Sequence, residues 1–239
     1  MNAMAMNTLK ILSGGAAQGL VEALALVFEA RSGWKIDGDF GAVGTMAAKL
    51  RAGAATDLVI LTDPVIAALE QDGFIVPASA TPVGLVETAV AVREGDTIVP
   101  IANAEELKAA FLAADALFVP DMTSSTAGQH VAKVLDQLGI ATQMRARLHE
   151  SPNGATAMRK LSESKFERPI GCTQSTEILR TPGLTLIGAL PPQCALATVY
   201  SAAITRQASD AAVAQVLIEI LTSGDHAAVR TNAGFLAID

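Results

Sequence analysis

The chain has 239 residues, of which 51% are hydrophobic and 17% charged, so it can bury a sizeable core and is not globally disordered. Its formal net charge is −7, without any block of Lys or Arg, which argues against nonspecific binding to nucleic acid. No apolar run approaches the ~18 residues of a membrane-spanning helix, so we expect a protein that is not embedded in a membrane. Because the net charge repels anions, an anion site in this chain has to be built locally.

The first residues, MNAMAMNTLKIL, lack the basic start and apolar stretch of a secretory signal. The sequence as written therefore predicts a cytoplasmic protein, whereas a chain trimmed of its signal would belong to the periplasm. Cys172 and Cys194 have neither C-x-x-C spacing nor a nearby His. A disulfide between them is one alternative, and two buried free thiols are the one that we expect. Without an H-E-x-x-H motif or a Cys/His cluster, we expect no metal site and no cofactor.

Short apolar runs that alternate with helical patterns dominate the chain. Strands are expected at residues 8–12, 35–40, 57–61 and 116–119, each followed by a loop and then a helix, and a further short strand is expected at 169–172, ending in a hydroxyl-rich loop. Thr45 is expected to cap a helix over 46–51. Two longer β-branched runs occupy 84–92 and 195–204. Strands that alternate with helices through short loops predict βαβ units and a mainly parallel sheet.

The loops that follow these strands are small or rich in hydroxyl groups. Free N–H groups in the first turn of a helix attract anions, and several such loops converge at the carboxyl ends of parallel strands. We therefore predict that neutral donors bind a small anion, and the candidate residues are Ser13, Gly14, Gly15, Gly44, Thr45, Thr123, Ser124, Ser125, Asn153, Gly154 and Gln174. Each of these residues is also compatible with an ordinary helix cap or turn.

The sequence motifs do not support dinucleotide binding, hydrolase activity or nucleoside triphosphatase activity. Gly14 and Gly15 invite a dinucleotide-binding interpretation, but with Gly19 they do not match the spacing G-x-G-x-x-G. Neither G-x-S-x-G nor a P-loop motif is present, so the sequence does not support a hydrolase or a nucleoside triphosphatase.

Six segments occur in a recognisable order over residues 9–235. They are LKILSGGAAQGLVEAL, FGAVGTMAAKLRAGAATDLVIL, VETAVAVREG, FVPDMTSSTAGQHVAKVL, SPNGATAMRKLSESKFERPIGCTQSTEI and LTSGDHAAVRTNAGF. In order and spacing the chain resembles the type II periplasmic solute-binding superfamily, specifically the molybdate-binding proteins of ABC importers.

This resemblance implies two α/β lobes with mixed, mainly parallel sheets, joined by two crossing strands, with the ligand in a cleft that closes by a hinge motion. The implied lobes are residues 8–83 with 196–239, and residues 84–195. The implied partners are a small anionic ligand and, if the protein is exported, an ABC permease. Molybdate-binding proteins usually have Tyr in the loop over 171–176, where this chain has Gln174. That difference favours a carboxylate or another polar anion.

Three functions remain open on this evidence. The first is a binding protein for a small anion, an oxyanion such as molybdate or a small carboxylate. The alternative is an isomerase of an unsaturated polycarboxylate such as trans-aconitate, since the superfamily includes such an enzyme; Asp121, Glu177 and His130 are its candidate acid/base groups. The third is a ligand-sensing domain of a transcription regulator, which would need a separate DNA-binding partner.

Overall fold

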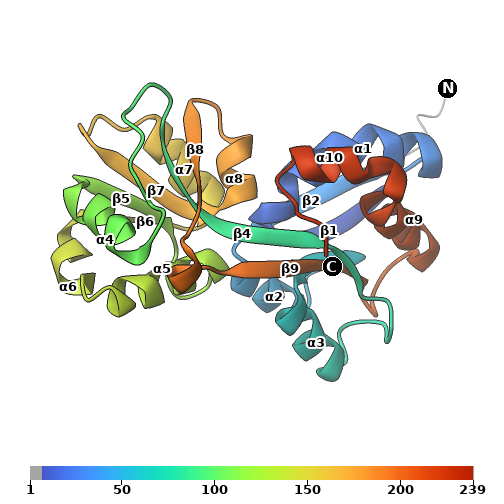
Figure 1. Cartoon of the computed structure of the whole chain (residues 1–239). Helices are drawn as coiled ribbons and strands as arrows, with labels where there is room; N and C mark the ends of the chain where they lie inside the picture. The colour runs from blue at the N-terminus through green and yellow to red at the C-terminus, as the bar shows by residue number, and fades with distance from the viewer. Residues whose placement is uncertain (1–6, 239) are drawn as a thin grey trace. The chain divides into compact units, whose positions relative to one another are not determined.

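The computed structural model describes residues 7–238 as a mixed α/β protein with two compact units, which confirms the predicted fold class (Figure 1). Unit 1 comprises the described residues up to Leu85 and from Val199 onward, and unit 2 comprises Val86–Thr198. The chain passes from one unit to the other within β4 (Thr81–Arg93) and near the start of β9 (Ala197–Ile204). Residues 1–6, the first half of the segment MNAMAMNTLKIL that lacks the features of a secretory signal, lie outside the described residues.

The sheet of unit 1 has the strand order β2-β1-β3-β9. Strands β2 and β3 run parallel to β1, which lies between them, and β9 runs antiparallel to β3. Besides β9, the strands are β1 (Thr8–Gly14), β2 (Lys35–Gly41) and β3 (Leu58–Thr62). Every residue of β3 is buried, as expected for a strand covered on both faces.

The helices of unit 1 follow their strands directly. A 3₁₀ turn, η1 (Gly15–Ala17), leads straight into α1; the helices are α1 (Gln18–Ser32), α2 (Val43–Arg51), α3 (Asp63–Gln71), α9 (Ala211–Thr222) and α10 (Ala227–Asn232). Helix α1 buries Leu20, Leu24 and Phe28 on one face and ends at Gly33, whose φ of 74° is left-handed. Both features agree with the apolar spacing and the glycine stop signal.

The sheet of unit 2 has the order β4-β7-β5-β6, with β8 paired to β4. Strand β5 is parallel to β6 and β7, whereas β4 is antiparallel to β7 and β8. These strands are β5 (Ala116–Pro120), β6 (Leu148–Ser151), β7 (Pro169–Gln174) and β8 (Leu184–Ala189). The sequence patterns predicted neither β6 nor β8, because LHES and LTLIGA are short and lack a buried, alternating apolar face.

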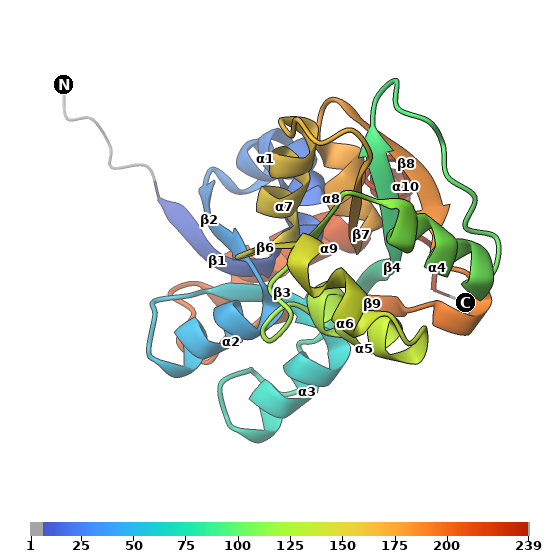
Figure 2. The same ribbon diagram turned by 90° about the vertical axis from the view of Figure 1, so that its left-hand side faces the viewer.

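Helices cover both faces of the sheet in unit 2. Figure 2 shows α4, α5 and α6 on one side and α7 and α8 on the other; the helices are α4 (Ala104–Ala113), α5 (Thr126–Gln137), α6 (Ala141–Met144), α7 (Gly154–Ser162) and α8 (Ser175–Arg180). Side chains alternate along β4, so Val90 and Val92 join the core beneath α4–α6 while Ala89 and Ala91 join the core beneath α7 and α8.

The start of α2 differs from the prediction. The N-cap residue is Ala42, and Val43 is the first helical residue, so Thr45 lies inside the first turn and does not cap the helix. The carbonyl of Ala42 accepts the bond from Met46 N at 3.0 Å, and the buried side chain of Val43 anchors the turn. Packing of Val43 therefore outweighs the capping preference of threonine, and the predicted cap at Thr45 is wrong.

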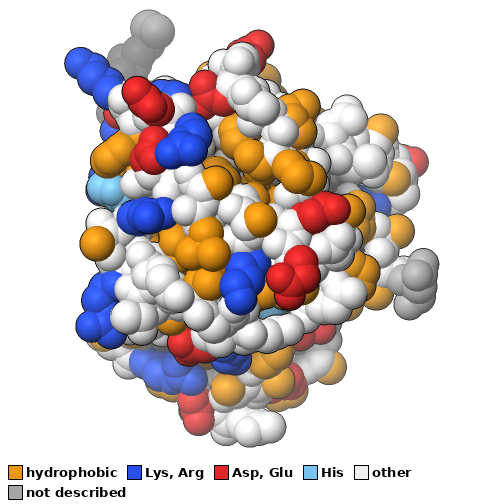
Figure 3. Space-filling model, turned by 60° about the vertical axis from the view of Figure 1, so that its left-hand side comes forward, with side chains coloured by type: hydrophobic (Ala, Val, Ile, Leu, Met, Phe, Trp, Pro, Cys, Tyr) orange, Lys and Arg blue, Asp and Glu red, His pale blue; other side chains and the backbone are white. Residues whose placement is uncertain are grey.

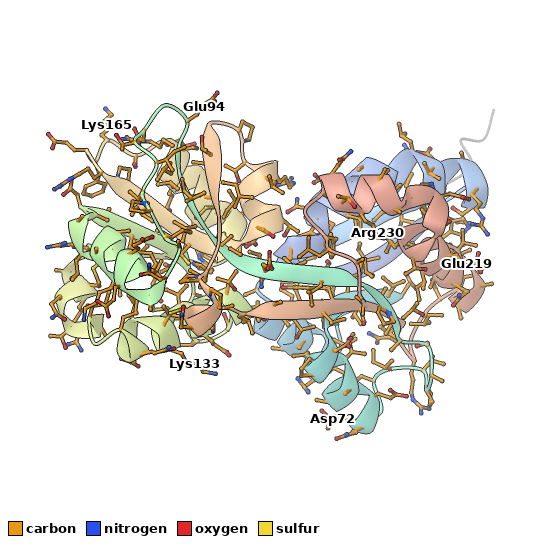
Figure 4. The ribbon with its side chains drawn as sticks, in the orientation of Figure 1. Asp72, Glu94, Lys133, Lys165, Glu219 and Arg230 are labelled. Atoms are coloured by element: carbon orange, nitrogen blue, oxygen red, sulfur yellow. The ribbon has the colours of Figure 1, made fainter. Side chains whose placement is uncertain are left out.

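Charged side chains lie mainly at the periphery. Figure 3 shows acidic and basic side chains interspersed on one face, and Figure 4 labels Glu219 on α9, which pairs with Arg31 of α1 at 2.5 Å. Within residues 7–238, no helix combines the length and the apolar character needed to cross a membrane.

Candidate functional site

The first candidate loop of unit 1 lies at the end of β1. Ser13 is fully buried, and its Oγ donates to the carbonyl of Gly14 at 2.9 Å. A Cβ atom on Gly14 would lie 2.9 Å from Tyr200 Cε1 and 3.1 Å from Val43 Cγ2. Only glycine fits there without a shift of its neighbours. The absence of a side chain at Gly14 lets Val43, the first residue of α2, pack against this loop.

Two helix starts of unit 1 come together at one edge of its sheet. Gly14 is aligned with Gly41 across the parallel pair β1–β2, so the loops that lead to η1–α1 and to α2 leave the sheet side by side. Among the described residues neither start has a side-chain cap, and neither has an acidic residue in its first turn. Gly44 and Thr45 are exposed in the first turn of α2. These backbone N–H groups can therefore receive an anion.

The third strand-to-helix junction of unit 1 is occupied by an internal carboxylate. Asp63 is the first residue of α3, and the hydroxyl of Ser201 donates to its Oδ1. An acidic side chain in the first turn stabilises the positive end of the helix. This junction therefore differs chemically from the starts of α1 and α2.

In unit 2, the hydroxyl-rich loop before α5 is also organised around a carboxylate. Thr123 and Ser124 donate both their backbone N–H groups and their hydroxyls to Asp121 Oδ1, at 2.7–3.0 Å. Ser125 is the N-cap of α5, and its Oγ accepts from Gly128 N at 3.4 Å. The hydrogen bonds from Thr123 and Ser124 lower the pKa of Asp121 from its ordinary value of 3.8 to about 2. Two of the predicted donors, Thr123 and Ser124, thus donate to a carboxylate of their own loop, and Ser125 acts as the cap of α5.

Asp121 should make the stability of the protein dependent on acidic pH. A lowered pKa means that the stabilisation is complete above the unfolded value near 3.8 and is lost as the pH falls toward 2. Because Asp121 is partly exposed, we expect Asp121→Asn to lower the free energy of unfolding by about 1 kcal/mol at pH 6. Urea denaturation from pH 6 to pH 2 checks this, and a wild-type advantage that stays constant over that range would contradict it.

The start of α7 also has a resident carboxylate, supplied by Glu177. Asn153 is the N-cap and accepts from Thr156 N at 2.8 Å. Glu177 is buried and accepts hydrogen bonds from Thr173 Oγ1 at 2.6 Å and from the backbone N–H groups of Gly154, Ala155 and Gln174. Burial raises the pKa of Glu177 above its ordinary value of 4.5, and the hydrogen bond from Thr173 is the main opposing influence.

Gln174, at the end of β7, has a different environment. It is 3% exposed, and neither Oε1 nor Nε2 has a hydrogen-bond partner within the described part of the chain. The same holds for Oγ1 of Thr88, which lies opposite Gln174 in the β4–β7 ladder and is 1% exposed. The other side chains among residues 7–238 that have a buried polar atom without a hydrogen-bond partner are also in unit 2: Ser151, Ser164, Thr176 and Thr198.

The candidate acid/base groups differ sharply in their surroundings. Asp121 is held ionised by four donors, and a ring nitrogen of His130, Nε2, lies 2.7 Å from the carbonyl of Cys194. Burial raises the pKa of Glu177, whereas the hydrogen bonds at Asp121 lower the pKa of that carboxyl. Both cysteines are buried and free, as predicted, and the described residues contain no group of three or more His, Cys, Asp or Glu suited to a metal ion.

Sequence reasoning missed Thr88 and the structural role of Glu177. A threonine within the apolar run VETAVAV was the available signal for Thr88, because a buried hydroxyl in a strand needs a partner. For Glu177 the nearby Thr173 and Gln174 gave a local signal, but its donors at Gly154 and Ala155 come from a different helix and could not be read from the sequence.

The model of the bacterial extracellular solute-binding protein family matches residues 9–236, and the chain belongs to this family. It is 26% identical to an aconitate isomerase from a Pseudomonas species over 243 residues, covering 97% of this chain and 88% of that protein.

Solved structures agree on the fold. The periplasmic molybdate-binding protein of Azotobacter vinelandii is 19% identical, with a TM-score of 0.82 and coverage of 97% of this chain and 100% of that chain. The sulfate-binding protein SubI of Mycobacterium tuberculosis is 16% identical, with a TM-score of 0.76 and coverage of 98% and 88%. The predicted resemblance to molybdate-binding proteins is thereby confirmed at the level of the fold.

Proposed function

We propose that this protein binds a small carboxylate anion through neutral donors, with the starts of η1–α1 and α2 in unit 1 receiving its negative charge. The observation that carries the proposal is the pairing of these two helix starts beside Gly14 and Gly41, without a side-chain cap or a first-turn acid from the described residues.

A carboxylate is favoured over a tetrahedral oxyanion by two observations. The relative from Pseudomonas is named for aconitate, a tricarboxylate. In addition, Gln174 takes the place where the resemblance to molybdate-binding proteins implies a tyrosine. Two adjacent helix starts provide several N–H groups, which suit the pairs of oxygens that carboxylates present.

Thr45→Asp tests the anion site without disturbing the fold. Thr45 is exposed in the first turn of α2, where a carboxylate favours the helix, so the variant should be at least as stable as the wild type. The new charge should repel a bound anion by about 2 kcal/mol, which raises Kd roughly 30-fold. Calorimetric titration with citrate, trans-aconitate and tricarballylate measures the effect.

The matched control for this variant is Thr45→Asn, which has nearly the same shape without the charge. It should bind the tightest of the three tricarboxylates within a few-fold of the wild type. Equal affinities for Thr45→Asp and Thr45→Asn would argue that the anion does not bind at the start of α2.

If the protein is exported, a permease that receives the ligand is the proposed partner.

A second candidate function is isomerisation of an unsaturated polycarboxylate, and it is favoured by Glu177. An allylic proton shift removes a proton from one carbon, moves the double bond and returns a proton to another carbon, which needs one acid/base group. A buried carboxyl with a raised pKa has the required character. NMR spectra of trans-aconitate incubated with the protein decide the matter, because no conversion at high protein concentration would exclude this activity.

A further inference from the structure

Unit 2 contains a cavity of about 410 Å³ at one end of its sheet. The end of β4, the turn that follows it, the last turns of α4 and the start of β7 line this cavity. Strand β5 runs parallel to β7, and α5 begins after the carboxyl end of β5. The cavity therefore lies at the opposite end of the sheet from the hydroxyl-rich loop before α5.

The floor of the cavity is part of a hydrophobic core. Val92, Ala110 and Ile170 line the cavity, and all three are buried and belong to the core beneath α4–α6. Ile98, which is 66% exposed, follows a lining residue in the turn after β4 and adds apolar surface to this part of the chain. A cavity of this size is large enough for an aromatic ring with a short chain, because apolar cavities of ~150 Å³ already bind benzene.

Three charged side chains line the cavity, and two of them are paired. Asp96 accepts a hydrogen bond from Arg93 Nε at 2.7 Å, and Arg168 pairs with Asp115 at 3.0 Å. The third is Glu167, whose backbone carbonyl accepts a bond from Arg93 at 3.4 Å. Within residues 7–238, the carboxylate of Glu167 has neither a hydrogen bond nor an ion pair.

The other ionic groups around the cavity leave this negative charge in place. Arg147 donates to the carbonyls of Leu112 and Ala114, so its charge is directed at the end of α4. Glu94 and Lys165, which Figure 4 labels, carry opposite charges and do not line the cavity. The cavity thus combines an apolar floor with one available carboxylate, in a chain whose net charge of −7 attracts cations.

We propose that this cavity binds a small organic cation, an ammonium group attached to an apolar body. The apolar body packs against Val92 and Ile170, and the ammonium group lies beside Glu167. A carboxylate in the same position would face like charge, whereas an ammonium group gains an ion pair. This site is independent of the proposed anion site in unit 1 and gives the protein a second ligand of opposite charge.

Phenethylamine and 2-phenylethanol provide the test, because they share an apolar body and differ in charge at pH 7. In NMR titrations of the isotope-labelled protein, phenethylamine should shift the amide signals of Gly95 and Thr97, which line the cavity, and leave that of Thr45 unchanged. The wild type should bind the amine about fivefold more tightly than the alcohol, since an ion pair with the exposed Glu167 is modest. Glu167→Gln should make the two affinities equal.

Three substitutions of alanine on α4 test the position of the site. Ala110→Leu fills the cavity from its floor, and Ala113→Leu narrows it from its exposed side, so both should abolish the shifts caused by either compound. Because Ala113 is exposed, its variant remains a valid test even if Ala110→Leu does not fold. Ala109→Leu is the matched control, since Ala109 is exposed on the same helix and does not line the cavity, and this variant should bind like the wild type.

Two results would overturn the inference. Phenethylamine that shifts neither Gly95 nor Thr97, or that binds Ala110→Leu and Ala113→Leu as tightly as the wild type, does not occupy this cavity. Equal affinities of the wild type for the amine and the alcohol would overturn the assignment to a cation. Neither result affects the anion site proposed in unit 1, which Thr45→Asp tests separately.

Discussion

Gly128→Ala is expected to lower the free energy of unfolding by about 3 kcal/mol or more, because overpacking against backbone atoms leaves few ways to relax. A Cβ atom on Gly128 would lie 2.1 Å from the carbonyl oxygen of Asp121 and 2.7 Å from that of Pro120. Gly128 is in the first turns of α5, so relief requires the helix to move away from the loop that holds Asp121.

Gly224→Ala is the matched control for this substitution. Gly224 is exposed in a short 3₁₀ helix, and a Cβ atom there meets nothing within 4 Å. Urea denaturation of both variants measures the difference. A change at Gly128 no larger than the change at Gly224 would mean that α5 does not pack against the carbonyl groups of this loop.

Gly154→Ala is expected to cost about 2–3 kcal/mol through a different mechanism. Its Cβ would lie 1.8 Å from Glu177 Oε2 and 2.2 Å from Thr173 Oγ1. The end of a free glutamate would simply move aside, but Glu177 is buried and accepts several hydrogen bonds, including those of Gly154 and Ala155. The substitution therefore displaces a carboxylate from the start of α7.

A double-mutant cycle identifies that mechanism. Glu177→Ala alone should be destabilising, because it leaves buried donors without an acceptor. Combined with Gly154→Ala it should cost clearly less than the sum of the two single changes, since the clash with the carboxylate is then gone. Strict additivity would show that the carboxylate of Glu177 does not lie against Gly154.

The fold was accessible from the sequence because its signals are local. Strands β3 and β5 are indicated by the apolar runs around Val59 and Leu117. Helix α1 is indicated by the spacing of Leu20 and Leu24, and its end by Gly33. The resemblance to molybdate-binding proteins then supplied the arrangement that periodicity alone could not. Thr45 shows the limit, since packing of Val43 set the helix start there.

The chemistry of the candidate site was less accessible because it depends on residues far apart in the chain. The sequence assigned Ser124 and Gly154 to an anionic ligand, and their position at helix starts justified that prediction. In the structure, carboxylates of Asp121 and Glu177 accept the hydrogen bonds of these residues. Only the tertiary contacts show at which helix starts a carboxylate of the protein already accepts the hydrogen bonds. Ligand binding by the predicted residues remains a prediction.

One measurement tests the central claim most directly: isothermal titration of the wild type and Thr45→Asp with citrate, trans-aconitate, sulfate and molybdate. We expect a tricarboxylate to bind the wild type, Thr45→Asp to weaken this binding roughly 30-fold, and sulfate and molybdate to bind more weakly. Binding of sulfate or molybdate alone, or tricarboxylate binding that Thr45→Asp leaves unchanged, would contradict it.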